Sequence, residues 1–175
     1  VMDRAALAFS QLQIIAVTLG PGSFTGIRIG LSMAKSLALA TGRPLYGVTT
    51  FELQLAVLPP AVWRDGPVMI VLETKRDDFY VQMYGSNQQP LGPAAAVPSR
   101  ALASYVTDLT DPKDALTLVG DGVKRALTGM DRNIGPRLYR QVSATPDARD
   151  LARLVVAEAV YYLSAYRFGQ LLLQL

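Results

Sequence analysis

Residues 13–30 read QIIAVTLGPGSFTGIRIG, an apolar run that ends in a glycine-rich turn and continues into an amphipathic stretch. The part over 13–19 has the length and β-branched content of a buried strand. Residues 24–41 predict a helix, because a glycine and then a proline follow them as stop signals. A second apolar run at 45–48 completes a strand–helix–strand unit. This order indicates parallel strands in a sheet that helices cover.

The rest of the chain continues to alternate strands and helices. Further helices are predicted at 51–58, 99–107, just after Asp121 and 147–162, and further strands at 68–72, 79–84, 116–119 and near 137–142. The strands at 68–72 and 79–84 flank a short polar turn, which predicts an antiparallel hairpin. The glycine- and proline-rich stretch 86–98 predicts a loop with one edge strand. The sequence therefore predicts an α/β fold throughout.

A proline- and glycine-rich stretch at 59–67 predicts a boundary between two lobes. We expect an N-terminal α/β lobe over 1–63 and a second α/β lobe over 64–175. The late helix from about 147 is a candidate to pack back on the first lobe.

Composition excludes several kinds of chemistry. The 175 residues include no cysteine and no histidine, and the net charge is +3. A disulfide scaffold, a thiolate nucleophile, a Ser-His couple and imidazole metal ligands are therefore excluded. No apolar stretch reaches the roughly 18 residues of a membrane span. Charged residues make up 18%, below the roughly 25% usual for soluble domains. This shortage fits a large core and an apolar surface covered by another chain equally well.

The glycine turn contains Gly20, Gly22 and Gly26. Such turns can hold phosphate, because free backbone N–H groups and the helix dipole point at the anion. A Walker loop requires Gly-Lys-Ser/Thr, however, whereas Ile and Arg follow Gly26. A dinucleotide fingerprint requires an acid about twenty residues later, and the next acid is the more distant Glu52. The motif therefore favours a tight turn and close helix packing over phosphate binding.

The predicted helix at 24–41 has a line of small residues, Gly26, Gly30, Ala34 and Ala38, at intervals of four. Its polar side chains fall in one sector of about 100°, which leaves more apolar surface than one sheet needs. We expect one face to pack on the sheet and another on a second helix, either the chain's own helix ending near Leu7 or a partner's. The expected packing residues at this helix–helix interface are Phe24, Ile27, Gly30, Leu31, Ala34 and Ala38.

Acidic and hydroxyl side chains offer weaker candidates for chemistry. Glu73, Asp77 and Asp78 lie at the predicted hairpin, where paired carboxylates can bind a cation or transfer protons, although a solvated turn is the favoured interpretation. Asp121 and Ser23 are expected to cap helices. The tyrosines of the late helix are expected at the edge of a core or at an interface, and they are Tyr161, Tyr162 and Tyr166.

The phrase GPGSFTGIRIG at 20–30, together with GVTT at 47–50, resembles the TsaB (YeaZ) family of tRNA threonylcarbamoyladenosine biosynthesis subunits. Weaker similarity extends over 73–84 and 119–122. The resemblance implies an ASKHA-like fold of two α/β lobes, the architecture of actin, sugar kinases and Hsp70. The strand that begins family members has no match here, so the N-terminal lobe is expected to be incomplete.

The resemblance also implies a non-catalytic role in the cytoplasm, without a metal or cofactor. Such subunits form a heterodimer with the catalytic TsaD-type protein, to which a TsaE-type ATPase is recruited, and they form a homodimer when alone. Contact with tRNA is then indirect, and no membrane is involved. Family members pair through their first two helices, which correspond here to the one ending near Leu7 and the one at 24–41. The alternative is an ASKHA-type nucleotide-binding or phosphotransfer enzyme that uses the Gly20–Gly26 loop and Glu73 or Asp77.

Overall fold

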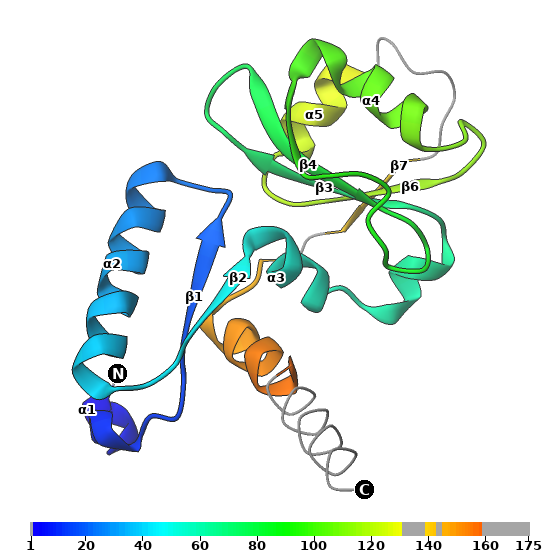
Figure 1. Cartoon of the computed structure of the whole chain (residues 1–175). Coiled ribbons are helices and arrows are strands. Elements are labelled where there is room, and N and C mark those ends of the chain that lie inside the picture. The colour runs from blue at the N-terminus through cyan, green and yellow to red at the C-terminus, as the bar shows by residue number, and fades with distance from the viewer. Residues whose placement is uncertain (1, 131–138, 143–144, 159–175) are drawn as a thin grey trace, which may run out of the picture. The chain divides into compact units, whose positions relative to one another are not determined.

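The computed structural model describes residues 2–130, 139–142 and 145–158. It divides into two compact units (Figure 1). The first unit comprises Val1–Gly20, Phe24–Ala56 and Pro146–Leu175, and the second comprises Pro21–Ser23 and Val57–Thr145. The change of unit at residues 56 and 57 thus lies before the proline-rich stretch at which we expected the boundary.

The first unit is built on two parallel strands. Strand β1 (Ile15–Gly20) pairs with β2 (Leu45–Thr49), and helix α2 (Phe24–Thr41) connects them. The other elements of this unit are α1 (Met2–Ala5), the 3-10 turn η1 (Phe9–Gln11), α3 (Thr50–Ala56) and a helix at 148–158.

Helices cover both faces of this small sheet, as parallel strands require. Ile15 and Val17 of β1 pack against α2 on one face, whereas Ala16 lies with α3 and the helix at 148–158 on the other. Val155 of that late helix is buried beside Val48 and Leu53, and Leu151 and Leu154 pack against the same cluster. The hydroxyl of Tyr46 also donates a hydrogen bond to Glu158. The late helix is therefore part of the first unit, although it lies about a hundred residues later in the sequence.

The second unit is built on a five-stranded mixed sheet with the order β5-β4-β3-β6-β7. Strand β3 lies at the centre, antiparallel to β4 and parallel to β6. The strands are β3 (Val68–Glu73), β4 (Asp78–Tyr84), β5 (Ala95–Pro98), β6 (Leu116–Val119) and β7 (Tyr139–Val142). The helical elements are η2 (Pro60–Arg64), η3 (Ser99–Ala101), α4 (Leu102–Leu109) and α5 (Val123–Met130).

The core of the second unit lies between this sheet and the helices α4 and α5. Met69 and Val71 of β3 contribute to it from the sheet, and Val106 and Met130 contribute from the helices, all with no exposed surface. The antiparallel pairing of β3 with β4 confirms the predicted hairpin.

Most predicted elements are present, several with the expected bounds. The predicted helix at 24–41 and the predicted strand at 116–119 match α2 and β6. Residues 99–101 form a 3-10 turn ahead of α4, where one continuous helix was predicted. The tyrosines Tyr161, Tyr162 and Tyr166 lie outside the described residues. None of the helices in the described part of the chain is long and apolar enough to cross a lipid bilayer.

Candidate functional site

The turn between β1 and α2 depends on one glycine in particular. Gly20 has a φ of +99°, a backbone conformation that side chains disfavour. Gly22 and Gly26 do not share this conformation. Gly20 therefore lets the chain leave the sheet and enter α2.

Three of the residues expected at the helix–helix interface lie on the side of α2 that faces the sheet. Ala34 is buried against Ile15 and Val17, and Leu31 and Ala38 pack on the same cluster. These three residues therefore contact the sheet of their own unit, and their contact with a second helix stays a prediction. A sheet, like a helix, can approach closely where side chains are small, so the line of small residues did not distinguish the two.

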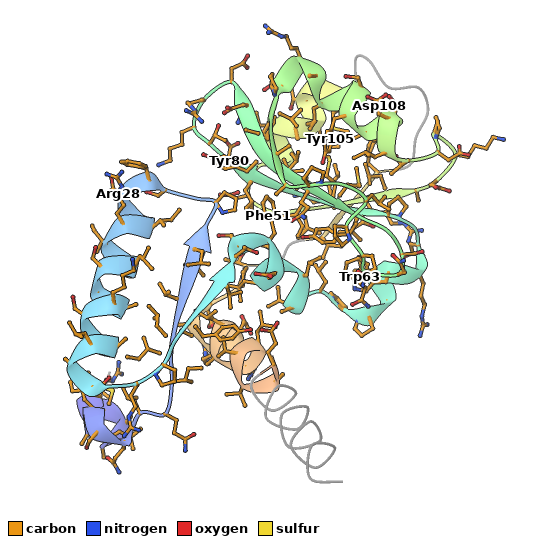
Figure 2. All side chains as sticks on the ribbon, in the orientation of Figure 1. Arg28, Phe51, Trp63, Tyr80, Tyr105 and Asp108 are labelled. Atoms are coloured by element: carbon orange, nitrogen blue, oxygen red, sulfur yellow. The ribbon has the colours of Figure 1, made fainter. Side chains whose placement is uncertain are left out.

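The other side of α2 presents large apolar side chains to solvent. Each exposes between 64% and 87% of its surface, and they are Phe24, Ile29, Met33 and Leu39. We call these four residues the outer surface of α2. The guanidinium of Arg28 lies 3.7 Å from the centre of the Phe24 ring, near the start of the helix (Figure 2). Four large apolar side chains exposed on one helix make this side of α2 a candidate interaction surface.

Of the six residues expected at the interface, Phe24 belongs to the outer surface, and Ile27 and Gly30 are half-buried. A Cβ atom added at Gly30 would meet nothing within 4 Å, so the backbone there is open to approach. Ile29, Met33 and Leu39 were missed by sequence reasoning. The signal was present, because apolar residues occur on nearly all sides of this helix.

The second candidate site surrounds Glu73 at the end of β3. The Nε and Nη2 atoms of Arg125 donate to the two oxygens of the Glu73 carboxylate over 2.9 and 2.8 Å. Arg125 also donates to the carbonyl oxygen of Asp78 over 2.9 Å, and its guanidinium lies 3.8 Å from the centre of the Phe79 ring. The hydrogen bonds from Arg125 lower the pKa of Glu73, and partial burial of the carboxylate opposes this shift without cancelling it. The Glu73 carboxylate is thus held as an ion in a bidentate pair.

Neighbouring acids of this site are also engaged in local contacts. The Oδ1 atom of Asp121 accepts a hydrogen bond from the Glu73 N–H over 2.9 Å, so Asp121 links the loop before α5 to β3. The hydroxyl of Thr74 donates to the Oδ1 atom of Asp78, and Arg76 Nη2 lies 3.5 Å from the Oδ2 atom of the same carboxylate. The described residues contain no group of three or more acidic side chains arranged to hold a metal ion. The site joins β3, β4 and α5 and offers no free carboxylate at Glu73.

Comparisons with known proteins assign the chain to a family. The family model described as TsaD, tRNA N6-adenosine threonylcarbamoyltransferase, matches residues 1–118. The tRNA threonylcarbamoyladenosine biosynthesis protein TsaB of Buchnera aphidicola is 26% identical over 162 residues, which are 90% of this chain and 73% of that protein. YeaZ from Pseudomonas aeruginosa has a similar structure, with a TM-score of 0.62 and 25% identity over 91% of this chain and 73% of YeaZ.

A longer relative is also similar. An uncharacterised protein of Mycobacterium leprae is 32% identical over 145 residues, which are 82% of this chain but only 36% of that protein. The chain thus spans about a third of this relative. The mixed α/β architecture of this chain is the ASKHA-like fold of YeaZ. The chain belongs to the TsaD family and is a homologue of TsaB and YeaZ.

Proposed function

We propose that this chain is a non-catalytic subunit in the synthesis of threonylcarbamoyladenosine in tRNA and that it pairs with a TsaD-type catalytic subunit. The observation that carries the proposal is the outer surface of α2, four large apolar side chains on the helix that begins in the GPGSFTGIRIG motif. Burying such side chains against another chain is favourable by about 25 cal/mol per Å² of apolar surface.

The pairing surface is narrower than the sequence indicated. Leu31, Ala34 and Ala38 hold α2 on its own sheet, and the outer surface is left for the partner. Through this pairing the chain recruits a TsaE-type ATPase and contacts tRNA indirectly, and it forms a homodimer when no partner is present. Because tRNA is the substrate of the assembly, we place it in the cytoplasm.

The alternative of a nucleotide-binding or phosphotransfer enzyme is less well supported. Such an enzyme needs a carboxylate free to bind a cation or accept a proton. Glu73 is instead bound by two of the three donor nitrogens of Arg125, and Asp77 is an exposed residue of the turn after β3. The full chain has no histidine or cysteine to replace Glu73.

The pairing is tested by measuring the dissociation constant of the chain with the TsaD-type protein of the same organism, by sedimentation or titration. We expect the double variant Ile29→Asn, Met33→Gln to raise this dissociation constant at least about tenfold, because it removes two apolar side chains from the outer surface. The fold should stay intact, because both side chains are exposed. Leu91→Gln is the matched control, since it replaces an exposed apolar residue of the second unit. An unchanged dissociation constant in the double variant contradicts the proposal.

A steric variant at Gly30, which is half-buried and lies outside the outer surface, tests the neighbouring side of α2. Gly30→Leu adds a side chain where a Cβ has open space, and leucine favours a helix more than glycine does. We expect the variant to fold at least as stably as the parent chain and to bind the partner more weakly, because the added bulk keeps a second helix away. Gly30→Ala is the control for the backbone effect alone.

A further inference from the structure

Helix α2 carries positive charge and no negative charge. Its sequence, FTGIRIGLSMAKSLALAT, contains Arg28 and Lys35 and no aspartate or glutamate. Both cations are exposed. At 3.6 residues per turn they lie about two turns apart and within about 20° of each other around the helix. That position lies between Phe24 and Leu39, so both cations border the part of the outer surface that these two residues form. Ile29 and Met33 lie about 100° or more further around the helix.

The described carboxylates leave these cations unbalanced. Neither Arg28 nor Lys35 takes part in the ion pairs of the described residues. Glu52 accepts hydrogen bonds from the N–H and hydroxyl of Thr49, at the start of α3. Helix α3 packs on the other face of the sheet from α2. Arg43, the next cation along the chain, donates a hydrogen bond to the carbonyl oxygen of Ser10. It is a further positive charge and does not balance Arg28 or Lys35.

This charge pattern has different consequences for the two possible partners. In a symmetric pair, the same surface of each copy faces the other, so two α2 helices bring four cations and no anion together. Like charges placed opposite one another weaken association, and complementary charges strengthen it and select the partner. A partner helix with acidic residues beside its apolar side chains has no such repulsion.

Building on the proposed function, we propose that Arg28 and Lys35 select an acidic partner helix and disfavour a second copy of this chain. The partner surface is an apolar stripe bordered by aspartate or glutamate. The homodimer and the heterodimer then use the same outer surface but respond to charge in opposite directions. The cations thereby move the equilibrium from homodimer to heterodimer whenever the partner is present.

The first test is the dependence of both complexes on salt. We measure the dissociation constants of the heterodimer with the TsaD-type protein and of the homodimer in 50 and 500 mM NaCl. Salt shortens the range of electrostatic interactions from more than ~10 Å to less than ~5 Å over this interval. We expect the heterodimer constant to rise roughly threefold or more and the homodimer constant to fall. A heterodimer that is unchanged or tightened by salt overturns the inference.

The second test reverses one charge. In Lys35→Glu, we expect the heterodimer dissociation constant to rise about tenfold and the homodimer constant to fall, because each copy then offers an anion to the other copy's Arg28. Lys124→Glu on α5 is the matched control, since it makes the same change of net charge at an exposed site of the second unit. Equal shifts in the two variants overturn the inference.

The outcomes also separate this inference from the proposed function. If the parent chain forms no heterodimer at all, the proposed function fails and this inference fails with it. If the heterodimer forms and depends on Ile29 and Met33 but not on Lys35, the proposed function stands and the charge selection is overturned. If both sets of variants weaken the heterodimer and only Lys35→Glu tightens the homodimer, both proposals are supported.

Discussion

The two units of the chain differ in how they cover their apolar side chains. In the second unit, the centre of β3 is fully buried, and Val68, Met69, Ile70 and Val71 expose no surface. In the first unit, the outer surface of α2 is exposed, and Leu7 and Phe9 near the start of the chain are about half exposed as well. Of the two, the first unit therefore leaves more large apolar side chains exposed.

The difference follows from the size of the two sheets. Five strands give the second unit a broad surface against which α4 and α5 bury their apolar sides. The first unit has two strands in the described part of the chain, and α2 is 18 residues long and apolar on more than one side. A narrow sheet covers one stripe of such a helix. The apolar side chains on its other side gain by contact with another chain.

The largest effect is expected where the second unit has no space. Gly120 has a φ of +117°, and a Cβ there would lie 2.3 Å from the carbonyl oxygen of Val71. Gly120→Ala should therefore destabilise this unit by about 3 kcal/mol or more, from backbone strain and the clash with β3. Trp63, the single tryptophan of the chain, lies in this unit and reports its unfolding in urea by fluorescence.

The same substitution elsewhere in the unit is the control. A Cβ at Gly129 in α5 would meet its nearest neighbour, the carbonyl oxygen of Ser99, at 4.0 Å. We expect Gly129→Ala to change the free energy of unfolding by less than about 1 kcal/mol. A similar loss in both variants would show that the close approach at Gly120 is not what holds this loop.

A second prediction compares one substitution in the two units. Met33 and Met130 both belong to helices, α2 and α5 respectively. The side chain of Met130 is fully buried in the core of the second unit, whereas that of Met33 is exposed on the first unit. Met130→Ala should cost about 3 kcal/mol, because it leaves a cavity, and Met33→Ala should cost less than about 0.5 kcal/mol in the isolated monomer. Circular dichroism during urea unfolding measures both, and comparable losses would contradict the division into a closed core and an open surface.

Much of the secondary structure could be predicted because it depends on neighbouring residues. The helix at 24–41 is marked by apolar periodicity and by the glycine and proline that follow it, and the strand at 116–119 is a short apolar run followed by a glycine. The hairpin of β3 and β4 is equally local, since a short polar turn joins two apolar runs. These features need no knowledge of the rest of the chain.

Local patterns could not predict which neighbouring element packs against each side of α2. The line of small residues suggested a helix as the neighbour, whereas the structure places Ala34 and Ala38 on the sheet. The pair of Glu73 and Arg125 was also missed, because 52 residues separate its members and the sequence shows no periodicity that connects them. Contacts of this kind depend on how strands and helices pack, which local patterns do not specify.

The smallest effect is expected at the ion pair of Glu73 and Arg125. This pair tests whether the apolar core alone accounts for the stability of the second unit. Glu73→Gln keeps the shape of the side chain and removes its charge. Because Arg125 is 37% exposed and solvent weakens the pair, we expect a loss of about 1 kcal/mol at pH 7, measured by Trp63 fluorescence in urea. Asp108→Asn, at an exposed carboxylate on α4, is the control and should change little.

The pH dependence identifies the source of that loss. Hydrogen bonds from Arg125 lower the pKa of Glu73 below its ordinary value of 4.5, so the folded chain binds this proton less readily than the unfolded chain. The stabilisation is therefore complete above that ordinary value and is lost as the pH falls through the lower pKa of the folded state. The parent chain and Glu73→Gln should differ at pH 7 and converge in acid. If the difference in unfolding free energy between the two chains stays constant with pH, Glu73 acts through packing rather than charge. The ion pair would then contribute nothing to the stability of the second unit.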